Sequence, residues 1–186
     1  MSNSQDFDLI GFLKYEFRKL VIYLKNPVAG VHTLPDWSLQ QAILRQSLLA
    51  FFSGAVSGFL SFQFFAFLYG IFLFPLIAIS GVPLLALFFY YYFQVFERRT
   101  VSYRKLLNLV VLANIPFLIF HIISNYVPVI NLVGTAMTGL ILVVGLHHNF
   151  SMDKRRAIRL VSILYLVLAL AWAYNQYEVM QLRNRF

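Results

Sequence analysis

The histidines are the first residues to consider for chemistry, because the long apolar stretches of this sequence contain no Asp, Glu, Lys or Arg. His147 and His148 are adjacent, whereas helix residues that hold one metal ion together normally lie three or four positions apart. Asp153 is the nearest carboxylate, and the chain has no cysteine. We therefore expect no metal site and no cofactor. A lipid-modifying enzyme that uses both histidines stays open as a third functional hypothesis.

His121 lies close to Ser124 and Asn125, a polar break between two apolar runs. We expect an interfacial histidine that is hydrogen-bonded to a loop carbonyl. The apolar stretches supply no carboxylate for a proton relay or for two-carboxylate hydrolysis. The sequence also lacks the G-x-S-x-G and H-E-x-x-H patterns and a phosphate-binding glycine loop. We expect no catalytic residue and no enzyme activity.

The most specific pattern is a strip of small side chains in the first long apolar stretch. It has two rows with a four-residue spacing, Ala50, Gly54 and Gly58 in one and Ser53, Ser57 and Ser61 in the other. On a helix these rows lie side by side and leave a smooth surface that a second helix can approach closely. The partner is either a second copy of the chain or, as we favour, another helix of the same chain.

Asparagines within the apolar stretches are candidates for hydrogen bonds between helices, each worth about 1 kcal/mol. The candidates are Asn108, Asn114, Asn125 and Asn131, and His121 joins them as an interhelical polar residue.

The elements that position these residues follow from the distribution of charge. No Asp, Glu, Lys or Arg occurs in residues 46–96, 106–152 or 160–177. Because about 20 apolar residues cross a bilayer as a helix, the first two stretches hold two helices each and the third holds one. We place the five spans near residues 42–64, 76–96, 106–123, 127–146 and 158–174, with a connection at 65–75. Pro75 and Pro83 predict an irregular start of the second span.

The segment ahead of these spans is amphipathic. Its apolar residues share one helical stripe, formed by Ile10, Leu13, Phe17, Leu20, Val21 and Leu24. Lys14, Arg18 and Lys25 lie on one shoulder of the stripe and, with Lys19, are candidates for contact with anionic lipid. The predicted fold is an all-α polytopic membrane bundle of five transmembrane helices, preceded by an amphipathic interfacial helix. Its parts are this helix (1–26), a cytosolic connector (27–41), the five-span domain (42–176) and an exterior tail (177–186).

Basic residues set the expected orientation. Of the 15 Lys and Arg, 13 lie in residues 1–45, 97–105 and 153–159, and the remaining two are Arg183 and Arg185. By the positive-inside rule, the amino terminus is cytosolic and the carboxy terminus exterior. The net charge is +8, but the basic residues lie between apolar spans and form no stripe on a soluble face. Nucleic-acid binding is therefore not expected.

Two stretches carry a resemblance to a known family. Asn108 to Pro116 (NLVVLANIP) and Leu140 to Ala157 (LILVVGLHHNFSMDKRRA) are similar to the Yip family of membrane proteins, named for interaction with Ypt/Rab GTPases. The resemblance covers roughly residues 25–176 and implies five spans after a cytosolic segment. Eukaryotic members use a long cytosolic segment in trafficking, whereas the first span here begins near Ala42. A compact bacterial-type member of the cytoplasmic membrane is therefore implied, and a Rab-type GTPase is a weak candidate partner.

These observations favour a non-enzymatic protein that organises or shapes the membrane through its basic interfacial helix. Insertion into one leaflet expands that leaflet, and each basic residue adds about 1 kcal/mol of attraction to anionic lipid. The alternative is a small transporter or channel-type subunit with a polar cavity near Asn114 and Ser124. Expected partners are anionic lipids, a second copy of the chain or other membrane proteins.

Overall fold

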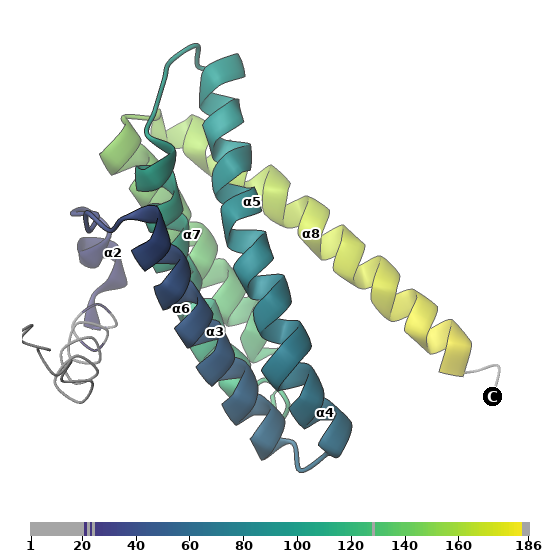
Figure 1. Ribbon diagram of the computed structural model, residues 1–186. Helices are drawn as coiled ribbons and strands as arrows, with labels where there is room; N and C mark the ends of the chain where they lie inside the picture. Colours follow the sequence, from purple (N-terminus) through teal and green to yellow (C-terminus); the bar gives the residue numbers. More distant parts are fainter. Residues whose placement is uncertain (1–20, 22, 24, 128, 184–186) are drawn as a thin grey trace, which may run out of the picture.

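Figure 1 shows the computed structural model, which describes residues 21, 23, 25–127 and 129–183. All regular structure in these residues is helical. In chain order the elements are α2 (Pro27–Gly30), α3 (Leu39–Leu60), α4 (Phe64–Leu68), the π-helix η1 (Tyr69–Leu73), α5 (Phe74–Val95), α6 (Tyr103–Ile122), α7 (Ile130–Phe150) and α8 (Lys154–Arg183). The predicted interfacial helix lies outside the described residues except at positions 21, 23 and 25.

Four helical segments are long and apolar enough to cross a membrane: Leu39–Leu60, Phe64–Val95, Tyr103–Ile122 and Ile130–Phe150. Long apolar helices of this kind are one of the two structures that satisfy all backbone polar groups inside a bilayer. The chain is therefore an integral membrane protein. The residues of the predicted fifth span, 158–174, lie within α8, a helix of 30 residues.

The second span differs most from its prediction. The expected connection at 65–75 is wrong, because the helical segment begins at Phe64 and continues to Val95. Only residues 61–63 separate it from α3. Pro75 still disturbs this segment as expected, since the five-residue π-helix η1 comes directly before α5. A proline has no N–H to donate, which favours a local change of hydrogen-bonding pattern. Pro83, in contrast, lies inside a continuous α5.

The helices begin and end where their sequences provide caps. Ser38 and Gln41 form a capping box at the start of α3, in which each side chain accepts a hydrogen bond from the other residue's backbone N–H. At the start of α6, the Ser102 hydroxyl accepts a single hydrogen bond from the backbone N–H of Lys105. At the end of α7, Ser151 adopts a left-handed conformation with φ of 50°. That turn ends α7 and leads into α8.

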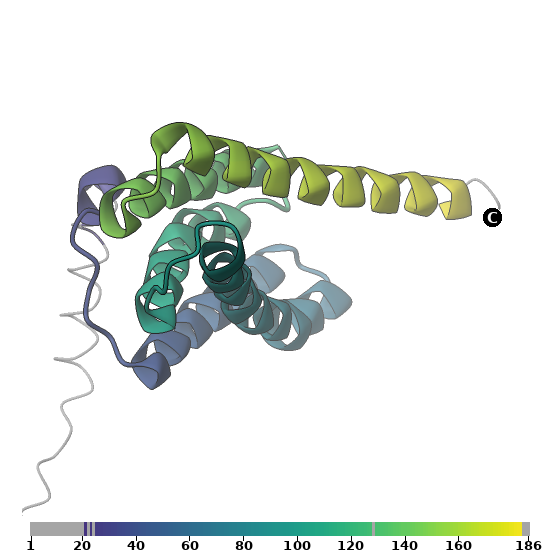
Figure 2. The same ribbon diagram turned by 90° about the horizontal axis from the view of Figure 1, so that it is seen from above.

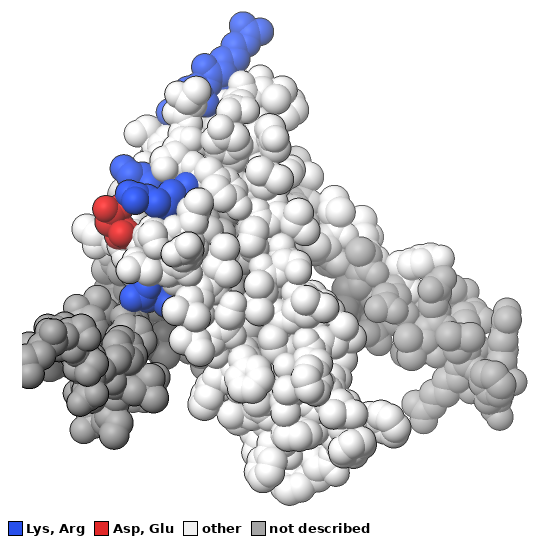
Figure 3. Space-filling model, in the orientation of Figure 1, with Lys and Arg blue, Asp and Glu red and all other residues white. Residues whose placement is uncertain are grey.

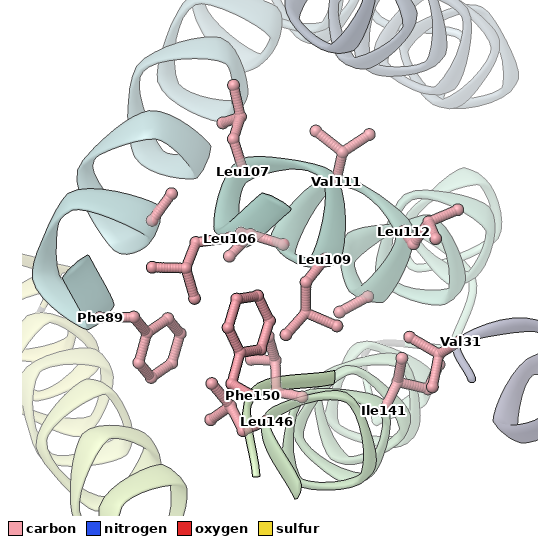
Figure 4. Close-up of a cluster of buried hydrophobic side chains, with 14 of the residues drawn as sticks. Val31, Phe89, Leu106, Leu107, Leu109, Val111, Leu112, Ile141, Leu146 and Phe150 are labelled. Carbon is pink, nitrogen blue, oxygen red and sulfur yellow. The ribbon is translucent and has the colours of Figure 1, made fainter. Parts of the chain in front are cut away.

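Helix α6 is the centre of the bundle, in contact with α3, α5 and α7. Figure 4 shows its side chains Leu106 and Leu109 directed at Phe89 of α5 and at Leu146 and Phe150 of α7. Leu106, Leu109, Phe89 and Leu146 are fully buried. The interior between these helices is therefore filled by apolar side chains.

Helix α8 is arranged differently from the other long helices. It packs against α7 and then diverges from the bundle, which both views of the ribbon show (Figures 1 and 2). Most of its described apolar side chains are exposed, including Ile163, Val167 and Leu170.

Among residues 25–170, the charged residues lie at one end of the bundle. Figure 3 shows Lys and Arg gathered where α3 and α6 begin and where α5 ends. The opposite end, formed by residues 61–63 and 123–127, contains no Lys, Arg, Asp or Glu. We call the end where α3 and α6 begin and α5 ends the charged end.

Candidate functional site: the charged end of the bundle

The connector ahead of α3 is fixed to α6 by one asparagine. The side-chain Nδ2 of Asn108 donates to the carbonyl oxygens of Pro35 and Trp37, at 2.9 and 3.2 Å. Asn108 is fully buried, so these bonds form in a region shielded from water. The prediction that Asn108 bonds to another span is therefore wrong, because it lies near the start of α6, at the level of the connector. Its contacts hold the chain that leads into the first span.

Surface charges reinforce the same connector. Arg104, at the start of α6, forms an ion pair with Asp36. The guanidinium of Arg45 lies over the Trp37 ring, with its Cζ atom 4.6 Å from the ring centroid. Exposed ion pairs add little stability, but cation–π stacking orients an aromatic ring. Trp37 is thereby held at the charged end.

Tyr23 anchors the described end of the amino-terminal segment. Its hydroxyl donates to the backbone oxygen of Leu112 at 2.9 Å, and only 8% of the residue is exposed. That oxygen cannot receive the usual helical hydrogen bond, because residue 116, four positions later, is a proline within α6. The phenol thus supplies the donor that Pro116 lacks. Burial raises the pKa of the Tyr23 phenol, which keeps the donor protonated.

A second attachment joins the connector to α7. The side-chain Nδ2 of Asn149 donates to the carbonyl oxygen of Val31 at 2.8 Å. The His32 ring stacks on the His148 ring with 4.0 Å between centroids. His147 is engaged separately, with its Nδ1 atom 2.8 Å from the carbonyl oxygen of Met152. The two adjacent histidines therefore have different partners. Within the described ranges no three His, Cys, Asp or Glu are grouped to hold a metal ion.

The small-residue strip on α3 packs inside the chain, against α4 and η1. An ideal Cβ atom built on Gly54 would lie 2.1 Å from the carbonyl oxygen of Gly70. One built on Gly58 would lie 2.8 Å from Cα of Phe67. Ala50 is buried beside Phe74. The two backbones therefore approach each other so closely that no side chain fits between them.

Two serines of the strip form hydrogen bonds near the carboxy-terminal end of α6. The Ser53 hydroxyl donates to the carbonyl oxygen of Leu118 on α6 at 2.5 Å. Ser57 accepts from Asn125 at both its carbonyl (2.9 Å) and its hydroxyl (3.1 Å). Ser61 donates back to the Gly58 carbonyl oxygen within its own helix. Ser53 and Ser57 thereby connect α3 to α6 and to the turn that follows it.

The remaining candidates are spread over the bundle and do not converge on one cavity. His121 stacks on Phe74 with 3.9 Å between ring centroids. Asn114 is half-buried in α6. In the described part of the chain, Asn131 Oδ1 is buried with no hydrogen-bond partner. Lys14, Arg18 and Lys19 lie outside the described residues, and Lys25 is exposed.

Two residues that form hydrogen bonds between segments, Gln46 and Tyr23, were not predicted, although the sequence contains a signal for each. Gln46 is 1% exposed, and its Nε2 donates across to the Ala78 carbonyl oxygen on α5 at 3.4 Å. A glutamine in a charge-free apolar stretch is itself such a signal. For Tyr23 the signal is indirect, because Pro116 implies a carbonyl in need of a donor but does not reveal which residue provides it.

No curated protein and no solved structure matches the chain significantly. The Yip1 domain family, in contrast, matches residues 24–174, which include the four apolar spans and most of α8. This match confirms the resemblance carried by the stretches at 108–116 and 140–157. The chain belongs to the Yip1 domain family of membrane proteins.

Proposed function

We propose that this protein organises or shapes the membrane without catalysing a reaction, by inserting residues 1–26 into the cytosolic leaflet beside the bundle. The observation that carries the proposal is the anchoring of Tyr23 on α6. Leu112 lies nine residues after Tyr103, which is about 14 Å along the helix at 1.5 Å per residue. Tyr23 is thus anchored beside α6, about one turn beyond the level of Asn108 and the connector, where we expect residues 1–26 to displace lipid.

The described positions of the segment support this arrangement. Tyr23 faces the bundle and is 8% exposed, whereas Val21, on the predicted apolar stripe, is 37% exposed. Lys25 is exposed as well. Lys14, Arg18 and Lys25 lie on a different face from Tyr23, so the segment can contact the bundle through Tyr23 and anionic lipid through these residues at once. Lys19, four positions before Tyr23, shares the Tyr23 face.

The proposal places the charged end in the cytosol of a bacterium, with α8 as a fifth span and the carboxy terminus outside. The gathering of the Lys and Arg of residues 25–170 at one end supports this orientation. Because the chain has no cysteine, the labelling of single introduced cysteines can determine this orientation. Thr100→Cys should react with an impermeant maleimide only from the cytosolic side, and Gln63→Cys only from the other side. An alkaline phosphatase reporter fused after Phe186 should be active outside the cytosol.

The core of the bundle favours an organising role over transport. A transporter of this size needs a polar path through its spans. Here Phe89, Leu106, Leu109 and Leu146 fill the space between α5, α6 and α7. The buried Asn108 donates to two connector carbonyls.

The test is electron microscopy of liposomes that contain anionic lipid and purified protein. The full-length protein should produce tubules or small vesicles, and a variant starting at residue 27 should not. Replacing Lys14, Arg18, Lys19 and Lys25 by glutamine should reduce the effect. The matched control exchanges the same residues between lysine and arginine, which preserves their charge and should preserve the effect. Vesicles of unchanged shape with the full-length protein would refute the proposal and move attention to flux assays.

A further inference from the structure

A cavity of about 230 Å³ lies at the charged end between the end of α5 and the start of α8. Its polar lining consists of Glu97, Arg156 and Arg159, and its apolar lining of Tyr92, Phe96, Leu160 and Ile163. One molecule of liquid water occupies about 30 Å³. The cavity is therefore large enough for a phosphate group with part of a glycerol.

The polar lining has more positive than negative charge. Glu97 is the only acidic residue of the lining, and its side chain is 12% exposed. It is already shared by two guanidinium groups, since its Oε1 lies 3.2 Å from Arg156 Nη1 and its Oε2 lies 3.6 Å from Arg99 Nη2. Among the described residues, Arg159 forms no ion pair, and the buried Nε of Arg99 has no acceptor. Donors thus exceed acceptors around this cavity.

The surrounding segments add to this excess. Residues 97–99 and 153–159 contain six Lys or Arg and two acidic residues, a net charge of +4. The first turn of α8 is already capped, because the carboxylate of Asp153 accepts from the backbone N–H of Arg156 at 3.2 Å. The positive potential at the cavity therefore comes from side chains and not from a free helix terminus.

The apolar lining continues along both helices away from the charged end. On α8, Leu160 and Ile163 share a face with Val167 and Leu170, which are 57% and 62% exposed. On α5, Tyr92 and Phe96 share a face with Leu84 and Phe88, at four-residue spacing. Helix α8 diverges from the bundle (Figures 1 and 2). Because Leu84 and Phe88 on α5 are also exposed, at 64% and 43%, both faces are accessible to acyl chains.

We infer that this cavity binds one anionic phospholipid of the leaflet at the charged end. Its phosphate lies between Arg156 and Arg159, and an acyl chain lies between the apolar faces of α5 and α8. Planar guanidinium groups bind phosphate oxygens in pairs, which suits two arginines on one cavity wall. Because the apolar lining can contact an acyl chain, the site favours a lipid phosphate over free phosphate. The site is separate from residues 1–26, so it stands whether or not that segment shapes membranes.

The test is lipid binding to the full-length protein in detergent, followed by native mass spectrometry. Dioleoyl phosphatidic acid should bind, and dioleoyl phosphatidylcholine should bind on the order of tenfold more weakly, because it carries no net charge. Inorganic phosphate at the same concentration should not displace the lipid. Equal binding of both lipids, or displacement by inorganic phosphate, would overturn the inference.

Variants separate a defined site from general surface charge. Arg159→Gln should weaken phosphatidic acid binding about tenfold, as expected for a lost charge-assisted hydrogen bond. The matched control is Arg155→Gln, which removes the same charge from an exposed residue outside the lining. It should leave the affinity within about twofold. Glu97→Gln releases Arg156 and should strengthen binding, a change of sign that misfolding cannot produce. Equal weakening by Arg155→Gln and Arg159→Gln would refute the site.

Discussion

Replacing Gly54 with alanine is expected to destabilise the protein, whereas the same replacement at Gly81 is expected to stabilise it. Both residues lie inside helices, so both substitutions gain about 1 kcal/mol of helix propensity. The two sites differ in their surroundings. A Cβ atom at Gly54 would lie 2.1 Å from the Gly70 carbonyl oxygen and 2.9 Å from the Phe74 ring, and one at Gly81 has nothing within 4 Å.

The magnitude follows from that distance. Real Cβ atoms essentially never approach a neighbour within 3.0 Å, so α3 and η1 would have to move apart by at least 0.9 Å, the difference between 3.0 and 2.1 Å. Overpacking of this kind costs about 1–3 kcal/mol. Because the neighbour is a backbone oxygen that cannot rotate away, we expect the upper end of that range. The propensity gain cancels in the comparison, so Gly54→Ala should be about 3 kcal/mol less stable than Gly81→Ala.

The assay is reversible unfolding of purified protein in mixed detergent micelles, with helix content and tryptophan emission as probes. Gly70→Ala should resemble Gly54→Ala, because a Cβ atom there would lie 2.1 Å from the Gly54 oxygen. The double variant should lose less than the sum of the two, since the first substitution already separates the backbones. Equal stabilisation by Gly54→Ala and Gly81→Ala would refute the close approach of α3 and η1.

Three further predictions concern the charged end. Tyr23→Phe should lower the free energy of unfolding by about 1–3 kcal/mol. The loss should be clearly smaller in a Pro116→Ala background, because residue 116 then has an N–H that can donate to the Leu112 carbonyl. Equal losses in both backgrounds would contradict the pairing of Tyr23 with that carbonyl. Asn108→Leu removes two hydrogen bonds to the connector, so limited chymotrypsin digestion should cut the connector faster while the spans stay intact, and unchanged cleavage would count against this attachment. The double variant His147→Ala, His148→Ala should leave the lipid composition of protein-containing vesicles identical to that obtained with the original protein, and any turnover that depends on these histidines would identify an enzyme.

The spans were predictable because charge is absent over lengths that only membrane helices need. The start of the second span was not, since the run from Phe64 to Leu73 is apolar whether it forms a loop or a helix. An irregular start near Pro75 was predicted from the N–H that proline lacks, but the same reasoning named Pro83, which lies inside a continuous α5. The length of the π-helix and its contact with Gly54 depend on a neighbouring helix, which no local pattern specifies.

At the charged end, too, the sequence predicted which residues are buried but not which residues they contact. Asn108 could be identified as a buried donor from its apolar surroundings, but its acceptors Pro35 and Trp37 lie about 70 positions away, at separations of 73 and 71 residues. Pairings over such separations are set by how the helices assemble. The stripe in residues 7–25 likewise gave no indication that Tyr23 contacts the bundle, because that residue lies off the stripe.

The π-helix also lets the chain before it keep its orientation while containing an extra residue. Each residue turns an α-helix by about 100°, and a π-turn contains one more residue than the α-turn it replaces. Because both turns complete one revolution, Tyr69–Leu73 covers about the rotation of four α-helical residues, and Phe64–Leu68 stays in phase with α5. Removing one residue within Tyr69–Leu73 would therefore restore regular pitch with little rotation, whereas removing one from Phe64–Leu68 or α5 would rotate the preceding chain by about 100°. The π-helix is thus the part of this span that best absorbs a one-residue insertion or deletion during evolution, provided that Gly70 remains opposite Gly54.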